Sequence, residues 1–271
     1  MTASTGRAAA VRLRDLHRSG HPVVLPNVWD AASARIVAAA GFAAVATSSA
    51  AVAESLGYPD GEAAPVEEVL DAVARIARAV PVPVTADMER GYGLPPAQLV
   101  ERLAASGAVG CNLEDSLPST RALVDAHAQA DFLAAVRESA CAAGIDLVIN
   151  ARIDVYLDDV FLDGVEFGAA TTTARLDEAI RRARLYVSAG ADCVYPIRMT
   201  SAGDIRAIVD ETGARVNILA APDAPTVAEL AALGVARVSF GAGIYRTAYQ
   251  QVRDIVAGIA ASSVEPTSHD R

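Results

Sequence analysis

Short apolar runs alternate with longer amphipathic segments along most of this chain. Each short run is partly β-branched and ends in a turn or polar residue, which predicts a buried strand. The longer segments repeat apolar positions at helical spacing and predict helices. The expected strands are residues 22–25, 43–47, 82–86, 109–113, 146–151, 192–196, 215–219 and 236–240. The expected helices are residues 30–40, 65–79, 95–106, 126–143, 173–189, 201–212 and 225–233, with a further helix at 243–261.

Glycine recurs where an expected helix gives way to the next strand. Glycine commonly ends helices because it adopts the left-handed backbone conformation without strain. Repeated strand–helix units predict one α/β domain, a (β/α)₈ TIM-type barrel over residues 1–262, followed by a flexible tail over 263–271. An open doubly wound sheet is the alternative, which the lack of a Gly-x-Gly-x-x-Gly motif after the first strand disfavours. The glycines are Gly41, Gly107, Gly144, Gly190, Gly213 and Gly234.

Two segments interrupt this rhythm, residues 50–64 after the second expected strand and residues 115–127 after the fourth. Both are expected to be long loops. In a barrel such loops lie over the mouth, where substrates bind. We therefore expect substrate-binding or lid elements in these two segments.

Composition narrows the class of protein. With 271 residues, 52% of them apolar, the chain can bury a large core. The formal net charge is −10, from 33 acidic and 23 basic residues without a basic cluster, which disfavours a nucleic-acid partner. No apolar stretch has the length of a signal peptide or a membrane span, so we expect a cytoplasmic protein without a membrane partner. The cysteines Cys111, Cys141 and Cys193 form no Cys-x-x-Cys pair, and disulfides are not expected.

Acidic residues follow two neighbouring expected strands. Asp87 and Glu89 follow the run 82–86, and Glu114 follows the run 109–113. Because parallel strands end at the same mouth of a barrel, these carboxylates should lie close together and repel one another unless a cation binds. Carboxylate oxygens suit Mg²⁺, or Mn²⁺. We therefore expect a metal on Asp87, with Glu89, Glu114 and Asp60 holding its water ligands.

Other polar residues at the same mouth could hold a substrate. Arg152 follows the fifth expected strand, and Ser48 and Ser49 follow the second, so together they could bind a carboxylate. A metal chelated by a 2-oxo acid would stabilise an enolate formed from that acid. Simpler interpretations exist for each residue taken singly: a lone Asp at a strand end is often a helix cap, and Arg152 could form an ion pair with Asp154 or Glu114.

A series of motifs, in this order, resembles the isocitrate lyase/phosphoenolpyruvate mutase superfamily. The resemblance extends over most of the chain, and the motifs are specific only in combination. They are Asn27-Val28-Trp29-Asp30, Thr47-Ser48-Ser49, Ser55-Leu56-Gly57-Tyr58-Pro59-Asp60-Gly61, Ala86-Asp87-Met88-Glu89-Arg90-Gly91-Tyr92-Gly93, Asn112-Leu113-Glu114-Asp115 and Asn150-Ala151-Arg152-Ile153-Asp154.

The resemblance implies a (β/α)₈ barrel, usually a homotetramer in which a C-terminal helix is exchanged between subunits. It implies Mg²⁺ bound by Asp87, with Asp60, Glu89 and Glu114 around it. Family substrates are small 2-oxo acids, their hydroxy-acid adducts or phosphoenolpyruvate-like compounds, and the reactions pass through a metal-bound enolate. Ser48, Ser49 and Arg152 match the carboxylate-binding positions of the family. With Asp87 and Arg198, they are the residues that we expect to bind the substrate.

The segment after the fourth expected strand departs from the two main branches of the family. The lyases carry a Cys-Gly-His motif there, whose Cys is the general acid, and the mutases carry Lys-x-x-Asn-Ser, whereas residues 115–123 contain neither. Ile197 follows Pro196 where the lyases have Glu, and Ala221-Pro222 stands where they have Asn. The metal half of the site is retained and the acid/base half differs. What remains resembles the less specialised members, including oxaloacetate decarboxylases and acylpyruvate-cleaving enzymes.

We therefore expect a Mg²⁺-dependent lyase that cleaves a C–C bond of a small 2-oxo or 2-hydroxy dicarboxylic acid, by decarboxylation or retro-aldol cleavage, through a metal-stabilised enolate. Asp60, Arg152 and Tyr58 are the expected catalytic residues. Tyr58 and Arg198 are candidates for proton transfer or for contact with the distal end of the substrate. The alternatives are mutase-type P–C bond chemistry and a non-catalytic barrel that binds a 2-oxo acid.

Overall fold

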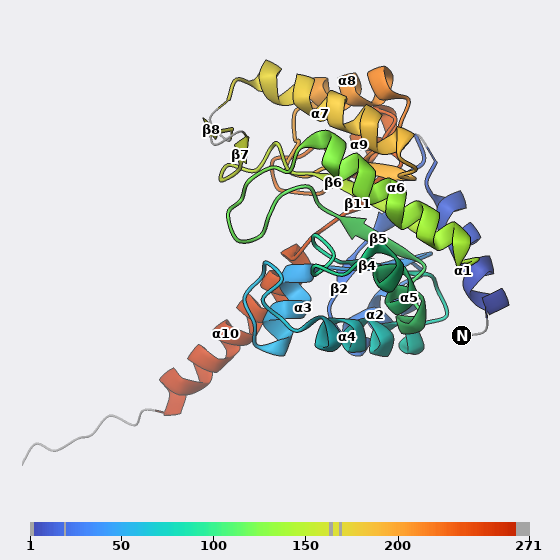
Figure 1. The fold of residues 1–271 in the computed structure, drawn as a ribbon. Helices are drawn as coiled ribbons and strands as arrows, with labels where there is room; N and C mark the ends of the chain where they lie inside the picture. Colours follow the sequence, from blue (N-terminus) through green and yellow to red (C-terminus); the bar gives the residue numbers. More distant parts are fainter. Residues whose placement is uncertain (1–2, 19, 163–164, 168–169, 264–271) are drawn as a thin grey trace, which may run out of the picture.

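The computed structural model describes residues 3–18, 20–162, 165–167 and 170–263, in which parallel strands form a closed barrel (Figure 1). The barrel strands are β1 (Val23–Leu25), β2 (Asn27–Val28), β3 (Val45–Thr47), β4 (Val84–Asp87), β5 (Gly110–Leu113), β6 (Val148–Ile153), β9 (Cys193–Pro196), β10 (Asn217–Leu219) and β11 (Arg237–Ser239). Only Pro26 separates β1 from β2, and they act as one barrel strand, because β1 pairs with β11 and β2 pairs with β3. A parallel bridge between Val194 and Val216 joins β9 to β10 and completes the ring.

Helices follow the strands and surround the barrel (Figure 1). This arrangement confirms the (β/α)₈ barrel predicted from the apolar pattern. The glycines expected to end helices all have positive φ, for example 86° at Gly107 and 99° at Gly190. The helices are α2 (Ala31–Ala39), α4 (Val66–Ala79), α5 (Pro96–Ser106), α6 (Ala126–Ala142), α7 (Thr172–Ser188), α8 (Ala202–Thr212) and α9 (Val227–Ala232).

Three elements were not predicted. The segment 50–64 is not one long loop, because α3 (Ser49–Leu56) begins directly after β3 and ends at Gly57, whose φ is 91°. This segment is rich in Ala, the best helix former. Its first five residues are all buried, so the alternation of apolar and polar positions that reveals an amphipathic helix is missing. α1 (Ala3–Leu16) precedes the barrel, and a short hairpin of β7 (Phe161–Leu162) and β8 (Val165–Glu166) follows β6.

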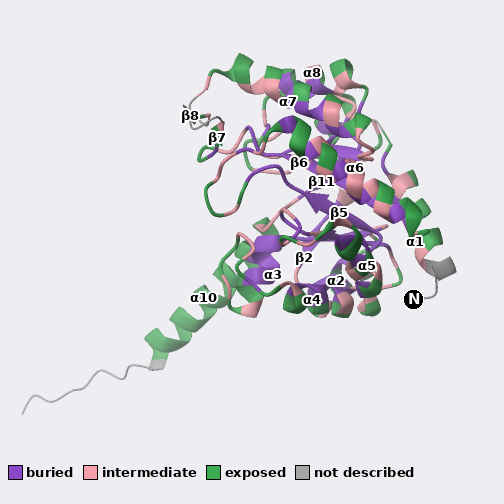
Figure 2. Cartoon of the chain, viewed as in Figure 1, coloured by how far each residue is buried: buried purple, intermediate pink, exposed green. Residues whose placement is uncertain are grey.

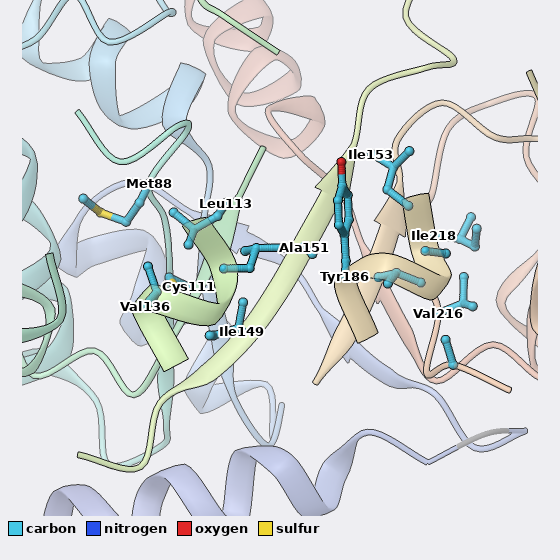
Figure 3. Packing of buried hydrophobic residues seen from close by; sticks show 14 of the residues in the cluster. Met88, Cys111, Leu113, Val136, Ile149, Ala151, Ile153, Tyr186, Val216 and Ile218 are labelled. Atoms are coloured by element: carbon cyan, nitrogen blue, oxygen red, sulfur yellow. The ribbon is translucent and has the colours of Figure 1, made fainter. Parts of the chain in front are cut away.

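The main hydrophobic core lies between the strands and the surrounding helices. Figure 3 shows Cys111 and Leu113 of β5 and Ile149 of β6 near Val136 of α6. Since successive strand residues point to opposite faces, Asn112 and Asn150 point into the barrel, as do the other residues that alternate with core positions. Cys111 and Cys193 are buried free thiols, as expected.

α1 closes the amino-terminal end of the barrel, which we call the base. Leu13 of α1 is completely buried in a cluster with Val23, Leu25 and other strand residues. Gly110 makes room for it, because a Cβ there would lie 2.9 Å from Leu13 Cδ2 and 3.0 Å from the carbonyl oxygen of Val148. Apolar side chains thus fill the base of the barrel. His17 lies one helical turn after Leu13.

α10 (Gly243–Ser263) follows the last strand and extends away from the barrel (Figure 1). Its surface is exposed along nearly its whole length (Figure 2). Near its start the rings of Tyr245 and Trp29 meet edge to face, with centroids 5.1 Å apart. Among the described helices, none combines the length and the apolar character needed to cross a membrane. Except for Ser263 at the end of α10, the tail expected over 263–271 lies outside the described residues.

Candidate active site at the barrel mouth

Asp87 is the last residue of β4, at the carboxyl end of the barrel. The backbone N–H of Ser49 donates a hydrogen bond of 3.0 Å to Asp87 Oδ2, and the N–H of Asp87 donates one of 2.8 Å to Thr47 Oγ1. Asp87 Oδ1 is buried and has no hydrogen-bond partner among the described residues. The amino-terminal end of α3 therefore fixes one oxygen of this carboxylate and leaves the other directed at the site.

Glu89 lies on a tight turn directly after β4. Its Oε1 accepts a hydrogen bond of 2.7 Å from the hydroxyl of Tyr92, and its Oε2 accepts one of 2.7 Å from the backbone N–H of Glu62. Glu62 returns the contact, because its Oε1 accepts hydrogen bonds from the N–H groups of Arg90 (3.0 Å) and Tyr92 (2.6 Å). The loop after α3 and the turn after β4 are thus bonded to each other through two carboxylates.

The backbone of this junction is strained. Glu62, Glu89 and Tyr92 have φ values of 57°, 47° and 55°, in the left-handed region that residues other than glycine adopt at a cost. Such conformations persist where the surrounding contacts hold them and are frequent at functional sites. The reciprocal hydrogen bonds of Glu62 and Glu89 are the contacts that hold them here.

Arg152 of β6 lies between two acidic residues. Its Nη1 is 2.5 Å from Glu114 Oε2, its Nε donates to Asp154 Oδ1 at 2.6 Å, and its Nη2 donates to Asp154 Oδ2 at 3.0 Å. These are the two ion pairs that the sequence left as the simpler interpretation of Arg152. Glu114 is 3% exposed and Asp154 is completely buried, so this cluster lies inside the mouth.

A second layer of buried ionic contacts supports Asp154. The hydroxyl of Ser116 donates a hydrogen bond to Asp154 Oδ2, and the N–H of Asp154 donates one of 2.9 Å to Asp115 Oδ1. Asp115 in turn pairs with Arg182 of α7 (2.9 Å) and accepts a hydrogen bond from Tyr186 (2.6 Å). This network ties the segment after β5 to the outer helices and fixes the position of Arg152.

The remaining expected residues divide into two groups. Ser48 and Ser49 are buried at the start of α3, and the Ser48 side chain does not cap its own helix, so both lie at the mouth. Asp60 is exposed, yet its charge raises the pKa of both Asp87 and Glu89, which places it near them.

Tyr58 and Arg198 are not brought into this cluster. The Tyr58 hydroxyl donates to Glu68 of α4 at 3.0 Å on the outer surface, because the turn at Gly57 directs the side chain toward α4. Arg198 is exposed and has a φ of 67°.

Burial raises the pKa of the three carboxyl groups at the mouth. It raises the pKa of Asp87, raises that of Glu89 to about 7, and raises that of Glu114 well above its usual range. The guanidinium of Arg152 partly opposes the shifts of Asp87 and Glu114, and the neighbouring carboxylates add to all three. Like charges held together in a cleft are typical of sites that bind a cation or exchange protons.

We tested whether these residues fit a magnesium ion. Within the described ranges no three His, Cys, Asp or Glu side chains lie close enough to ligate one ion together. Tyr92 and Arg152 contact Glu89 and Glu114, whereas Asp87 Oδ1 has no hydrogen-bond partner in the same ranges. Because Mg²⁺ usually keeps several water ligands, the residues fit an ion with Asp87 as its direct protein ligand and the other carboxylates bonded to its waters.

Sequence reasoning missed Glu62 and Tyr92. Both flank glycines with positive φ, Gly61 and Gly91, and such glycines mark turns at which a neighbouring side chain can be aimed inward. It also missed Arg237, a charged residue inside the apolar strand run 236–240 that is completely buried. The charge of Arg237 within an apolar strand run was the sequence signal that could have identified it.

Comparison with known proteins agrees with this geometry. A crystal structure from Burkholderia cenocepacia J2315, assigned as a phosphonomutase, is 42% identical with a TM-score of 0.84 and covers 92% of this chain and 99% of that one. A 2-methylisocitrate lyase assigned in Corynebacterium glutamicum is 28% identical over 266 residues, which are 91% of this chain and 79% of the relative. Oxaloacetate acetylhydrolase with its product oxalate is 26% identical with a TM-score of 0.81, covering 97% and 91%.

The sequence model of the phosphoenolpyruvate phosphomutase family matches residues 13–260. That match includes every strand of the barrel and all of the mouth residues described above. The chain therefore belongs to the phosphoenolpyruvate phosphomutase family, within the isocitrate lyase/phosphoenolpyruvate mutase superfamily.

Proposed function

We propose that the protein is a Mg²⁺-dependent lyase that breaks a C–C bond in a small 2-oxo or 2-hydroxy dicarboxylic acid. The observation that carries this proposal is the buried Oδ1 of Asp87, which has no hydrogen-bond partner in the described part of the chain and lies among carboxyl groups whose pKa values are raised. Oxygen ligands of this kind suit a hard divalent cation. The C–C cleaving relatives, 2-methylisocitrate lyase and oxaloacetate acetylhydrolase, support the reaction class.

Arg152 and the start of α3 are proposed to hold the substrate carboxylates. Three N–H groups of Arg152 are engaged by Asp154 and Glu114, and its remaining N–H groups can donate to an anion. Asp154 binds the guanidinium in a two-point contact, which fixes its plane. At α3, the buried Ser48 hydroxyl and the backbone N–H groups of the first turn are suited to a second carboxylate.

The segment after β5 favours decarboxylation over retro-aldol cleavage. Retro-aldol cleavage needs a base that removes a proton from the substrate hydroxyl. Loss of the carboxylate β to the 2-oxo group as CO₂ instead needs stabilisation of the enolate that forms, which then takes a proton from solvent water to give the product. The three carboxylates of this segment are otherwise engaged: Glu114 pairs with Arg152, Asp115 pairs with Arg182, and Asp125 caps α6. A bound Mg²⁺ would polarise the 2-oxo group and offset the developing charge.

The test is turnover of a panel of acids by wild type and by Asp87→Asn, with and without chelator. The panel contains oxaloacetate, isocitrate, methylisocitrate and malate derivatives, with pyruvate, glyoxylate and CO₂ followed as products. We expect one acid to be cleaved and Asp87→Asn to lose at least about a thousandfold in kcat/KM, or roughly 4 kcal/mol. Asp71→Asn, which changes an exposed carboxylate on α4, is the matched control. Chelator-sensitive turnover in Asp87→Asn would refute the metal assignment.

Mutase-type P–C bond chemistry is the second candidate, favoured by the 42% identity to the protein assigned as a phosphonomutase. Phosphonopyruvate belongs in the same panel for this reason. A phosphorus NMR signal that moves between phosphonate and phosphate ester would establish this second function. Its absence alongside CO₂ release from a 2-oxo acid would leave the lyase as the activity of this site.

α10 is proposed to assemble the protein into a homotetramer. Val252, Ile255 and Val256 on this helix are 52%, 54% and 57% exposed, and one apolar helix face of this kind is typical of a protein–protein contact. Light scattering on wild type and Ile255→Asp tests the proposal. We expect a tetramer that Ile255→Asp dissociates, whereas Gln251→Asp, at an exposed position of the same helix, leaves it intact.

A further inference from the structure

The interior of the barrel beneath the candidate site is unusually polar. Barrel interiors are commonly filled by branched aliphatic side chains. Here Val216 and Ile218 belong to the outer core (Figure 3), so Asn217 between them points inward, and by the same alternation Arg237 points inward beside Val238. Most of the buried polar atoms without a hydrogen-bond partner among the described residues lie in this interior, on His17, Thr85, Asp87, Asn150, Asn217 and Arg237.

Arg237 is the cation of this interior. It is completely buried at the first position of β11, near the base of the barrel. Its Nη2 donates to Asn112 Oδ1 at 3.3 Å, while its Nε and Nη1 have no hydrogen-bond partner among the described residues. Within the same residues no carboxylate lies within ion-pair distance of it, so its charge is not neutralised by contact.

The guanidinium of Arg237 reaches the level of the candidate site. Asn112 of β5 is the direct cross-strand neighbour of Asp87 of β4, so the residue that Arg237 contacts lies beside the proposed metal ligand. The charges of Asp87 and Arg237 interact through this interior, and the same cation helps to depress the pKa of His17 at the base. Arg237 therefore lies between the base and Asp87.

We infer that Arg237 is a positioning residue that supplies a cationic floor to the site, which weakens binding of a cation at Asp87 and strengthens binding of a dianionic 2-oxo acid or its enolate above it. The inference rests on the proposed function. Because Arg237 is completely buried and forms no ion pair among the described residues, neither bulk solvent nor a contacting carboxylate screens its charge, which therefore acts over several ångströms. A positive charge beneath the site favours binding of the metal ion together with its anionic ligand over binding of the metal ion alone.

The test compares wild type with Arg237→Met, Arg237→Lys and Asn217→Leu, using Mn²⁺ and oxalate as probes. Mn²⁺ affinity is measured by electron paramagnetic resonance of the free ion, and oxalate affinity by calorimetry at saturating Mn²⁺. In Arg237→Met we expect the Kd of Mn²⁺ to fall about tenfold and the Kd of oxalate to rise about tenfold. Arg237→Lys keeps the charge, and Asn217→Leu changes a neutral neighbour of similar shape. Both should stay within about threefold of wild type.

Melting temperature separates this role from a purely structural one. Replacing an unpaired buried charge by an apolar side chain of similar length is expected to leave the melting temperature unchanged or to raise it. A lower melting temperature with weaker binding of both probes, or unchanged affinities, would overturn the inference while wild type still binds Mn²⁺. A wild-type protein that binds no Mn²⁺ would overturn the proposed metal site and the inference with it.

Discussion

The mouth and the base of this barrel bury charge in opposite ways. At the mouth, Glu114 and Asp154 are neutralised by direct contact with Arg152. In the interior, Arg237 is buried and forms no ion pair within the described part of the chain, and at the base His17 is buried as well. Burial lowers the pKa of both side chains. Burial at the mouth instead raises the pKa of its carboxyl groups.

From this difference we infer that the mouth is the end of the barrel that is organised to bind ligands. The contacts at the mouth are specific and geometrically demanding, and they hold strained backbone at Glu62, Glu89 and Tyr92. In the interior, the only hydrogen bond that Arg237 makes to a described residue goes to the neutral Asn112, and we infer that its charge acts on the site over a distance. Direct contacts position reacting groups, whereas an isolated charge sets the potential in which they act.

The largest expected effect comes from removing the cation of the mouth. Arg152→Met leaves Glu114 and Asp154 buried without a cationic partner, which should lower the free energy of unfolding by about 3–5 kcal/mol and abolish turnover. Urea denaturation measures the first effect. Adding Glu114→Gln should recover part of the stability and none of the turnover. An Arg152→Met protein as stable as wild type would show that the mouth, like the interior, tolerates uncompensated charge.

The two regions should also give opposite pH dependences. Glu89 has a pKa of about 7 against an ordinary 4.5, so its contribution to stability is present below pH 4.5 and is lost as the pH rises through about 7. His17 has a pKa of about 4 against an ordinary 6.5, so its contribution is present above pH 6.5 and is lost as the pH falls through about 4. Each shift corresponds to about 3 kcal/mol at most.

Unfolding free energies between pH 4 and pH 8, measured with chelator, check this prediction. Because the two pH ranges overlap between pH 4.5 and 6.5, the two contributions largely cancel there in wild type. In Glu89→Gln the stability should therefore rise with pH across this range, and in His17→Gln it should fall. Each variant serves as the control for the other. The same slope change in both variants would show that the two ends of the barrel are not electrostatically distinct.

A smaller effect is expected where the base is packed by apolar contacts. Gly110→Ala would place a Cβ 2.9 Å from Leu13 Cδ2 and 3.0 Å from both Thr85 Oγ1 and the carbonyl oxygen of Val148. Overpacking of this kind should cost about 1–3 kcal/mol in thermal unfolding. Gly203→Ala on α8 is the control, because its nearest atom would be 3.7 Å away and alanine favours helix. Equal stability of the two variants would mean that α1 can shift freely.

The smallest effect is expected outside both regions. Tyr58→Phe removes a hydroxyl that bonds to Glu68 on the outer surface, so stability should change by less than about 0.5 kcal/mol and turnover by less than about twofold. Steady-state kinetics on the identified substrate gives the result. A tenfold loss of kcat would contradict this prediction and indicate that Tyr58 transfers a proton at the mouth.

The architecture could be predicted from local patterns of the chain. Apolar periodicity located every barrel strand except β2, which lies beyond the expected run 22–25, and the helix-ending glycines located the boundaries between repeats. The sequence also placed Asp87, Glu89, Glu114 and Arg152 at one mouth, since parallel strands bring their carboxyl ends together. α3 and α1 were not predicted. The buried residues of α3 gave no distinctive apolar period, and neither did α1 at the amino terminus.

The contacts that those side chains make became known only from the three-dimensional structure. It paired Arg152 with Glu114 and Asp154, bonded Tyr58 to Glu68, joined Glu62 to the turn of Glu89, and brought Arg237 to an asparagine 125 residues away. Such contacts depend on strand register, on the direction of each side chain and on what else competes for it. None of these is a property of a short window of sequence, because the electrostatic and hydrogen-bond partners of a buried group come from elsewhere in the chain.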